Sequence, residues 1–186
     1  MKKILVVTAV CAAFAAVATT AQAQRSASGV QFGVSGGLNV PVGDLGDSQG
    51  AGFGLMGHVT GRPGNFPFAI RGDVGILTNP GKTITPIGGG QSFSTEGVTW
   101  TTANANIIYN FEGAKDATFV PYIIGGAGVY NGNRGIGTKF GVNGGGGLTF
   151  RLAGFDAFTE ARFTNIFTDG SSARMIPITF GVKFKQ

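Results

Sequence analysis

Residues 176–184 read Ile-Pro-Ile-Thr-Phe-Gly-Val-Lys-Phe. Large apolar side chains occupy every second position, from Ile176 to Phe184, and smaller or polar residues stand between them. Successive side chains of a β-strand point to opposite faces, so this alternation indicates a strand with one apolar face and one polar face.

The same period of two recurs through most of the chain, whereas the spacing typical of an amphipathic helix is scarce. One further segment, 119–130, is apolar at both parities, so its facing stays open. We count eight strands of roughly 8 to 12 residues, the span that a tilted strand needs to cross a bilayer. They fall near 30–40, 53–60, 68–77, 102–111, 119–130, 140–151, 160–163 and 176–184.

The composition narrows the function classes. The 186 residues include 34 glycines and 16 phenylalanines, and only 12% are charged, against a usual share of about 25%. Few charges and many aromatic rings argue against disorder. One Cys and one His leave no basis for a disulfide scaffold or a zinc site, so we expect no metal and no cofactor. The net charge of +5 is dispersed, so we expect no nucleic-acid partner.

The first 23 residues have the pattern of an export signal. Lys2 and Lys3 precede an apolar stretch from Ile4 to Ala18, and Ala21-Gln22-Ala23 forms a small-x-small cleavage site. We therefore expect a signal peptide at 1–23 and one domain at 24–186. No later stretch offers the apolar run of a spanning helix. The exported chain is then either a soluble β protein or a protein that crosses a membrane as strands.

Loop lengths and aromatic residues favour the membrane. The expected connections are 41–51, 61–67, 78–97, 112–118, 131–138, 152–156 and 168–174, and the odd-numbered ones are generally longer, as in bacterial outer-membrane barrels. Rings near strand ends suit the headgroup zone of a bilayer. The predicted aromatic girdle comprises Phe53, Phe68, Trp100, Tyr109, Phe111, Tyr130, Phe140, Phe150, Phe167 and Phe184.

Several stretches resemble the outer-membrane β-barrel family of small OmpA- and OmpX-like proteins. The likeness rests on 119–123, 125–128, 160–162 and 176–184 and extends over essentially all of 24–186. It implies an all-β fold, an eight-stranded antiparallel up-and-down transmembrane β-barrel with periplasmic termini. It also implies residence in the cell outer membrane among its lipids, insertion by the barrel-assembly machinery, and a monomer.

The charged residues that fall within strands suggest a cluster inside such a barrel. Arg71 and Asp73 share one strand face, and Glu160 and Arg162 share another, four strands away. The interior of an eight-stranded barrel is just wide enough for side chains to fill, so these four residues are expected to meet across the lumen. Such a cluster either fills the lumen or gates ions.

Three motifs suggest other activities. Residues 33–37 match G-x-S-x-G, but the hydrolase motif requires a sharp strand-to-helix turn, and here it lies within a strand. His58 is the candidate acid–base residue of a lipid-modifying enzyme, yet Thr60 stands where a nearby serine is wanted. Residues 71–73 have the sequence Arg-Gly-Asp, which is the cell-adhesion tripeptide. Both charged side chains are nevertheless expected to point into the barrel.

We therefore expect a non-enzymatic barrel with a structural or surface-interaction role, carried by outer loops and chiefly by 78–97. Three alternatives remain open: a narrow ion-passing channel, an outer-membrane lipid-modifying enzyme, and a soluble lipocalin-like carrier.

Overall fold

A computed structural model describes residues 29–64, 66–85, 91–111 and 118–185 of the chain. Most of these residues lie in eight long strands, and a five-residue helix and a short hairpin complete the structure. The long strands are β1 (Gln31–Val42), β2 (Gly52–Gly61), β3 (Phe68–Asn79), β6 (Val98–Asn110), β7 (Phe119–Gly132), β8 (Gly137–Arg151), β9 (Phe155–Thr168) and β10 (Ser171–Lys185). The helix is α2 (Asp44–Ser48), and the hairpin is β4 (Thr83–Ile84) with β5 (Phe93–Ser94). The expected signal peptide lies outside the described residues.

The eight long strands close into a barrel in the order β1-β10-β9-β8-β7-β6-β3-β2. Each pairs antiparallel with its sequence neighbour among the long strands, and β1 pairs with β10 to close the ring, from Gln31 opposite Lys185 to Val42 opposite Arg174. Closure leaves no free edge in the ring, so every long strand has a partner on both sides, as a bilayer requires. The predicted eight-stranded up-and-down barrel is confirmed.

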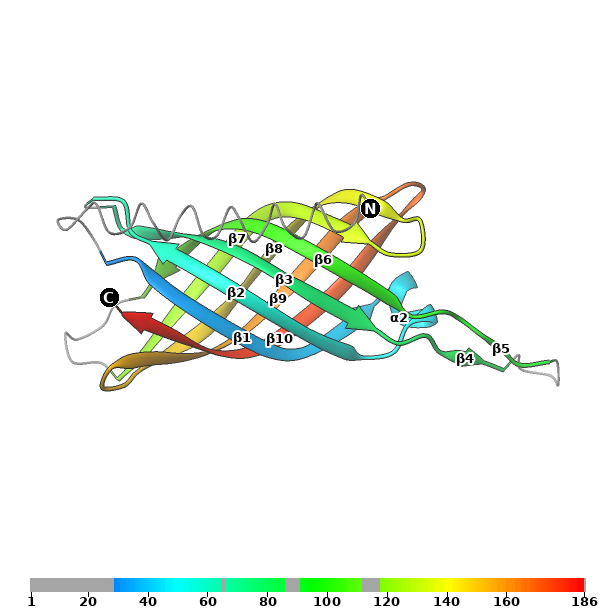
Figure 1. The fold of residues 1–186 in the computed structure, drawn as a ribbon, viewed down its shortest axis with the longest axis horizontal. Coiled ribbons are helices and arrows are strands. Elements are labelled where there is room, and N and C mark those ends of the chain that lie inside the picture. The colour runs from blue at the N-terminus through cyan, green and yellow to red at the C-terminus, as the bar shows by residue number, and fades with distance from the viewer. Residues whose placement is uncertain (1–28, 65, 86–90, 112–117, 186) are drawn as a thin grey trace, which may run out of the picture.

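The strands run obliquely along the barrel, and the barrel has two distinct ends (Figure 1). β1 begins and β10 ends at one of them, here called the terminal end. The other, the loop end, carries 43–51, 80–85, 91–97, 133–136 and 169–170. The β4–β5 hairpin projects beyond the loop end as an arm.

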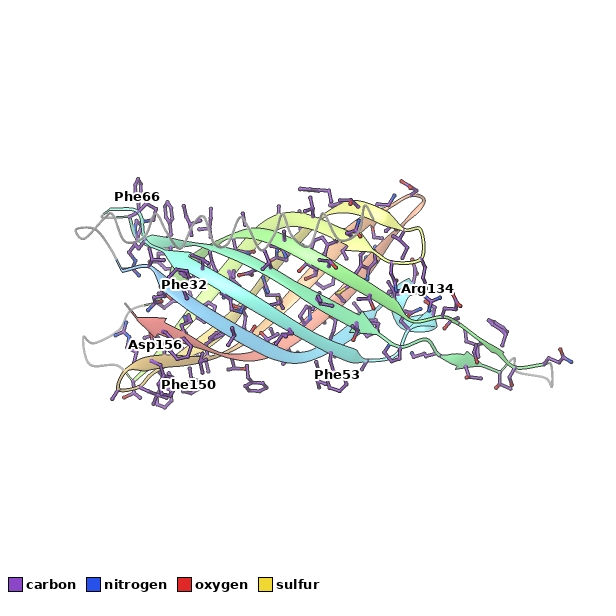
Figure 2. The ribbon with its side chains drawn as sticks, viewed as in Figure 1. Phe32, Phe53, Phe66, Arg134, Phe150 and Asp156 are labelled. Carbon is purple, nitrogen blue, oxygen red and sulfur yellow. The ribbon has the colours of Figure 1, made fainter. Side chains whose placement is uncertain are left out.

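Side-chain facing follows the predicted alternation. On β6, Thr102, Asn104 and Asn106 are buried inside the barrel, whereas the intervening Ala103 and Ala105 are exposed outside. The outer face is strongly apolar (Figure 2): Phe53 is 70% exposed, and Leu55 and Phe180 are similar. The exposure of so many large apolar side chains around a closed barrel is unfavourable in water and favourable in the hydrocarbon of a bilayer. For β7, whose facing the sequence left open, Phe119, Ile123 and Val129 are exposed, and Val120, Tyr122, Ile124 and Tyr130 are buried.

Two residues of the predicted aromatic girdle are placed elsewhere. Trp100 and Tyr130 are each 2% exposed and lie inside the barrel, so their assignment to the girdle is wrong. The reason is parity: Trp100 shares its face with the buried Thr102, and Tyr130 pairs opposite Thr102. The remaining eight residues are exposed or half-buried on the outer face: Phe53, Phe68, Tyr109, Phe111, Phe140, Phe150, Phe167 and Phe184.

The last connection is shorter than predicted. The expected outer loop 168–174 is a two-residue turn at 169–170, because β9 and β10 continue their pairing up to Thr168 opposite Ser171. Gly170 has a φ of 81°, a backbone conformation that glycine adopts without strain. The predicted asymmetry holds in part: the two longest connections, β1 to β2 and β3 to β6, start and end at the loop end, but 133–136 and 169–170 at the same end are short.

Among the described residues, no helix is both long and apolar enough to cross a membrane.

Candidate functional site in the lumen

The four charged residues predicted to meet across the lumen do so. Arg71 donates to Glu160 through two parallel hydrogen bonds, Nη1 to Oε2 at 2.9 Å and Nη2 to Oε1 at 2.8 Å. Arg162 Nη1 lies 2.8 Å from Asp73 Oδ2. Each arginine also contacts the acid of its own strand: Arg71 Nε is 2.8 Å from Asp73, and Arg162 Nε is 3.0 Å from Glu160.

The barrel geometry explains this meeting. Residues two apart on a strand share a face, so Arg71 and Asp73 both point inward from β3, as do Glu160 and Arg162 from β9. In the ring order these two strands lie four places apart, on opposite walls. All four side chains are almost completely buried. Two cations balance two anions, and pairing of this kind is what allows such charges to remain buried.

Two polar side chains extend the cluster. Asn106 donates from Nδ2 to Asp73 Oδ2 at 2.9 Å, and the Tyr122 hydroxyl donates to Glu160 Oε2 at 2.7 Å. Both reach the cluster from the wall formed by β6 and β7. Sequence reasoning did not identify either residue, because strand alternation gives the facing of a side chain and not its height in the barrel.

A second chain of contacts joins Ser35, His58 and Asp73. Ser35 Oγ lies 2.7 Å from His58 Nε2, and His58 Nδ1 lies 2.9 Å from Asp73 Oδ1. An ionised carboxylate only accepts hydrogen bonds, so a neutral His58 carries its proton on Nδ1. Nε2 is then an acceptor, and the Ser35 hydroxyl donates to it. The sequence analysis considered only a serine close to His58 along the chain, where Thr60 stands, and missed Ser35, which lies on the neighbouring strand β1.

This Ser–His–Asp arrangement has the connectivity of a hydrolase triad, but its surroundings are closed. Ser35 and His58 are each 3% exposed, and the Phe158 ring packs edge-on against the His58 ring with centroids 5.6 Å apart. Asp73 already accepts from Arg71, Arg162 and Asn106. The array therefore acts as a buried hydrogen-bond chain that ties β1, β2 and β3 to the charged cluster.

Clusters of buried apolar side chains lie on both sides of the charged cluster. Toward the loop end lie Met56, Leu77, Trp100, Tyr130, Ile166, Ala173 and Met175, with Leu45 of α2 packed against them. Toward the terminal end lie Ala69, Ile108, Tyr122 and Ile124. Lys183 Nζ sits 5.2 Å from the Phe158 ring centroid and 3.3 Å from Thr149 Oγ1. The described interior is thus filled by apolar and polar side chains around the charged cluster.

The described residues contain no group of three His, Cys, Asp or Glu side chains placed to hold a metal ion. Residues 71–73 form the Arg-Gly-Asp tripeptide of cell adhesion. The charged side chains of Arg71 and Asp73 point into the lumen and are buried.

No protein-family model and no curated protein matches the sequence. Solved structures do resemble the fold. Neisserial surface protein A is 16% identical, with a TM-score of 0.61 over 84% of this chain and 97% of that chain. OprG of Pseudomonas aeruginosa is 10% identical, with a TM-score of 0.57 over 87% and 98%. The N-terminal β-barrel domain of OprF, also from Pseudomonas aeruginosa, is 15% identical, with a TM-score of 0.52 over 85% and 97%. This chain therefore has the fold of the small outer-membrane barrels, and its apolar belt is what that membrane requires.

Proposed function

We propose that this outer-membrane barrel is a non-enzymatic, non-conducting protein that acts through the structures at its loop end. The observation that carries the proposal is that buried side chains fill the described interior of the barrel. The paired charges lie between two clusters of buried apolar side chains, with Trp100 and Met175 in one and Ile108 and Ile124 in the other. A porin keeps an aqueous channel open, whereas this interior is filled by side chains.

The loop end presents an arm on a fixed base. At that base, Gly81 forms an isolated bridge with Gln49, and the Gln49 side chain donates to the Glu96 carbonyl at 2.9 Å. From the other side, Arg134 Nε donates to the Gly97 carbonyl at 2.8 Å, and its guanidinium pairs with Glu96. Figure 2 shows Arg134 at this end of the barrel. The β4–β5 ribbon leaves this base and exposes Phe93. A rigid base with an exposed ribbon supports a role in surface interaction.

Conductance recordings test whether ions pass through the lumen. The purified, refolded barrel is added to a planar lipid bilayer beside a 16-stranded porin as positive control. We expect no discrete current steps from the wild type under conditions in which the porin conducts. Reproducible steps would overturn the proposal in favour of the narrow ion-passing channel.

Cysteine labelling on intact cells tests which end is presented. Ser94→Cys places a thiol on the arm, and Ala153→Cys places one in the turn 152–154 at the terminal end. We expect a membrane-impermeant maleimide to label Ser94→Cys on intact cells, and Ala153→Cys only after permeabilisation. The reverse pattern would mean that the arm faces the periplasm. Recovery of both variants in the soluble fraction without detergent would support the soluble-carrier alternative.

The Ser35–His58–Asp73 contacts favour one alternative function, a lipid-modifying enzyme. Within this hydrogen-bonded array, Ser35 would be the nucleophile and His58 the base. Ser35→Ala removes the first and His58→Ala the second. We expect lipid A composition to be the same in cells that carry the wild type, either variant, or an empty vector. A change in lipid A that requires both Ser35 and His58 would overturn the non-enzymatic proposal.

A further inference from the structure

Arg174 occupies an unusual place on the lipid-facing surface. It lies on β10 with the same parity as the exposed Ile178 and Phe180, and its own side chain is exposed. Its cross-strand neighbours are Val42 on one side and Asn165 on the other. A guanidinium on the outer face of a membrane strand is costly unless it meets water, a headgroup or a partner.

The hydrogen bonding of Arg174 is incomplete within the described part of the chain. Its Nε donates to Asn165 Oδ1 at 3.3 Å, and among the described residues its two terminal nitrogens have no acceptor. Other cations at the loop end are engaged differently: Arg134 pairs with Glu96, and Lys139 pairs with Asp169. Asn165 is itself a polar residue that faces outward between Phe163 and Phe167, so Asn165 and Arg174 form one polar patch.

The position of the patch along the strands indicates its surroundings. The stacked rings of Phe140 and Phe167, with centroids 6.2 Å apart, lie nearby. Phe167 pairs opposite Ser172, two positions nearer the 169–170 turn than the Asn165–Arg174 pair. Aromatic rings of this kind mark the interface between hydrocarbon and headgroups. The Arg174 backbone therefore lies two residues to the hydrocarbon side of these rings, and its long side chain can extend from there to the depth of the lipid phosphates.

We propose that Arg174, with Asn165 as its positioning residue, binds the phosphate of a membrane lipid headgroup. The planar guanidinium offers two parallel donors that match a phosphate, and Asn165 Oδ1 fixes the guanidinium through Nε. The flanking Val42 and Val142 provide an apolar surface for the acyl chains of the same lipid. The ligand is therefore a phosphate that carries its own hydrophobic chains.

Native mass spectrometry of the refolded barrel in detergent micelles tests this site. The protein is titrated with phosphatidic acid, with phosphatidylcholine, and with phosphatidic acid in the presence of millimolar inorganic phosphate. We compare the wild type with Arg174→Gln, Arg174→Lys and the matched control Arg134→Gln, which removes the same charge from an arginine at the turn 133–136. Heat-modifiable gel mobility establishes that each variant is folded.

We expect the wild type to bind one phosphatidic acid about tenfold more tightly than Arg174→Gln does, as the loss of a charge-assisted contact implies. Arg134→Gln should bind like the wild type, Arg174→Lys should be intermediate, and inorganic phosphate should not compete. Equal affinity of wild type and Arg174→Gln would overturn the proposal. Complete competition by inorganic phosphate would show a free-anion site instead, and a dimer lost in Arg174→Gln would show a contact between copies; both outcomes also overturn it.

Discussion

Arg71 and Glu160 face each other from opposite walls of the barrel and join through two parallel hydrogen bonds of 2.9 and 2.8 Å. Both side chains are 1% exposed, so removal of either one leaves a buried charge without its main partner. We expect Arg71→Ala or Glu160→Ala to lower the free energy of unfolding by about 3 to 5 kcal/mol. Urea unfolding of the barrel refolded into lipid vesicles measures the loss.

A double-mutant cycle separates pairing from general damage. The combined Arg71→Ala and Glu160→Ala variant should lose less than the sum of the single losses, with a coupling energy of about 1 to 3 kcal/mol. Lys139→Ala, which breaks the exposed pair with Asp169, should cost less than about 1 kcal/mol. Strictly additive single losses would mean that Arg71 and Glu160 do not support each other.

Trp100 gives a direct optical test of the lumen, because it is the only tryptophan in the chain. It lies inside the barrel at 2% exposure, so brominated acyl chains in the surrounding bilayer should quench its fluorescence weakly. As a matched control, Trp100→Phe combined with Phe53→Trp moves the fluorophore to the 70% exposed outer position, where strong quenching is expected. Strong quenching of the wild type would show that Trp100 faces the lipid and would contradict its position inside the barrel.

Two neighbouring glycines on β7 test which residues of this strand face the lumen. Gly126 faces inward and Gly125 faces outward. An added Cβ on Gly126 would collide with the Ala105 carbonyl and with Asn106 Oδ1, whereas on Gly125 its nearest neighbour is the Asn143 carbonyl at 3.8 Å. We expect Gly126→Ala to lower the free energy of unfolding by about 1 to 3 kcal/mol, because the packed interior must shift. Gly125→Ala should change it by less than about 0.5 kcal/mol. Equal effects on vesicle-refolded protein would contradict the facing of β7.

The sequence predicted the architecture well because alternation survives in almost every strand. The period of two placed Arg71, Asp73 and Glu160 inside the barrel, and the structure agrees. Ring closure followed from the same pattern, since a spanning sheet cannot keep free edges in hydrocarbon.

What the sequence did not predict depends on register and on aromatic chemistry. Ser35 meets His58 because β1 and β2 pair at one particular offset, which the alternation does not specify. Trp100 and Tyr130 stand near strand ends, where aromatic rings occur both in membrane belts and in packed interiors. The parity of Trp100 relative to Ala103 was an available signal for the interior position; the doubly apolar stretch around Tyr130 offered none.

The most direct test of the account measures the surroundings of the outward face of β6. Spin labels on cysteines at Ala103, Ala105 and Ile107, with Ser94→Cys on the arm as the water-exposed reference, report collisions with oxygen and with a water-soluble nickel complex in vesicle-refolded protein. We expect the three strand labels to meet oxygen and to be shielded from nickel, and Ser94→Cys to show the opposite. Strand labels shielded from both reagents, or open to nickel, would contradict a lipid-facing belt and with it the transmembrane barrel.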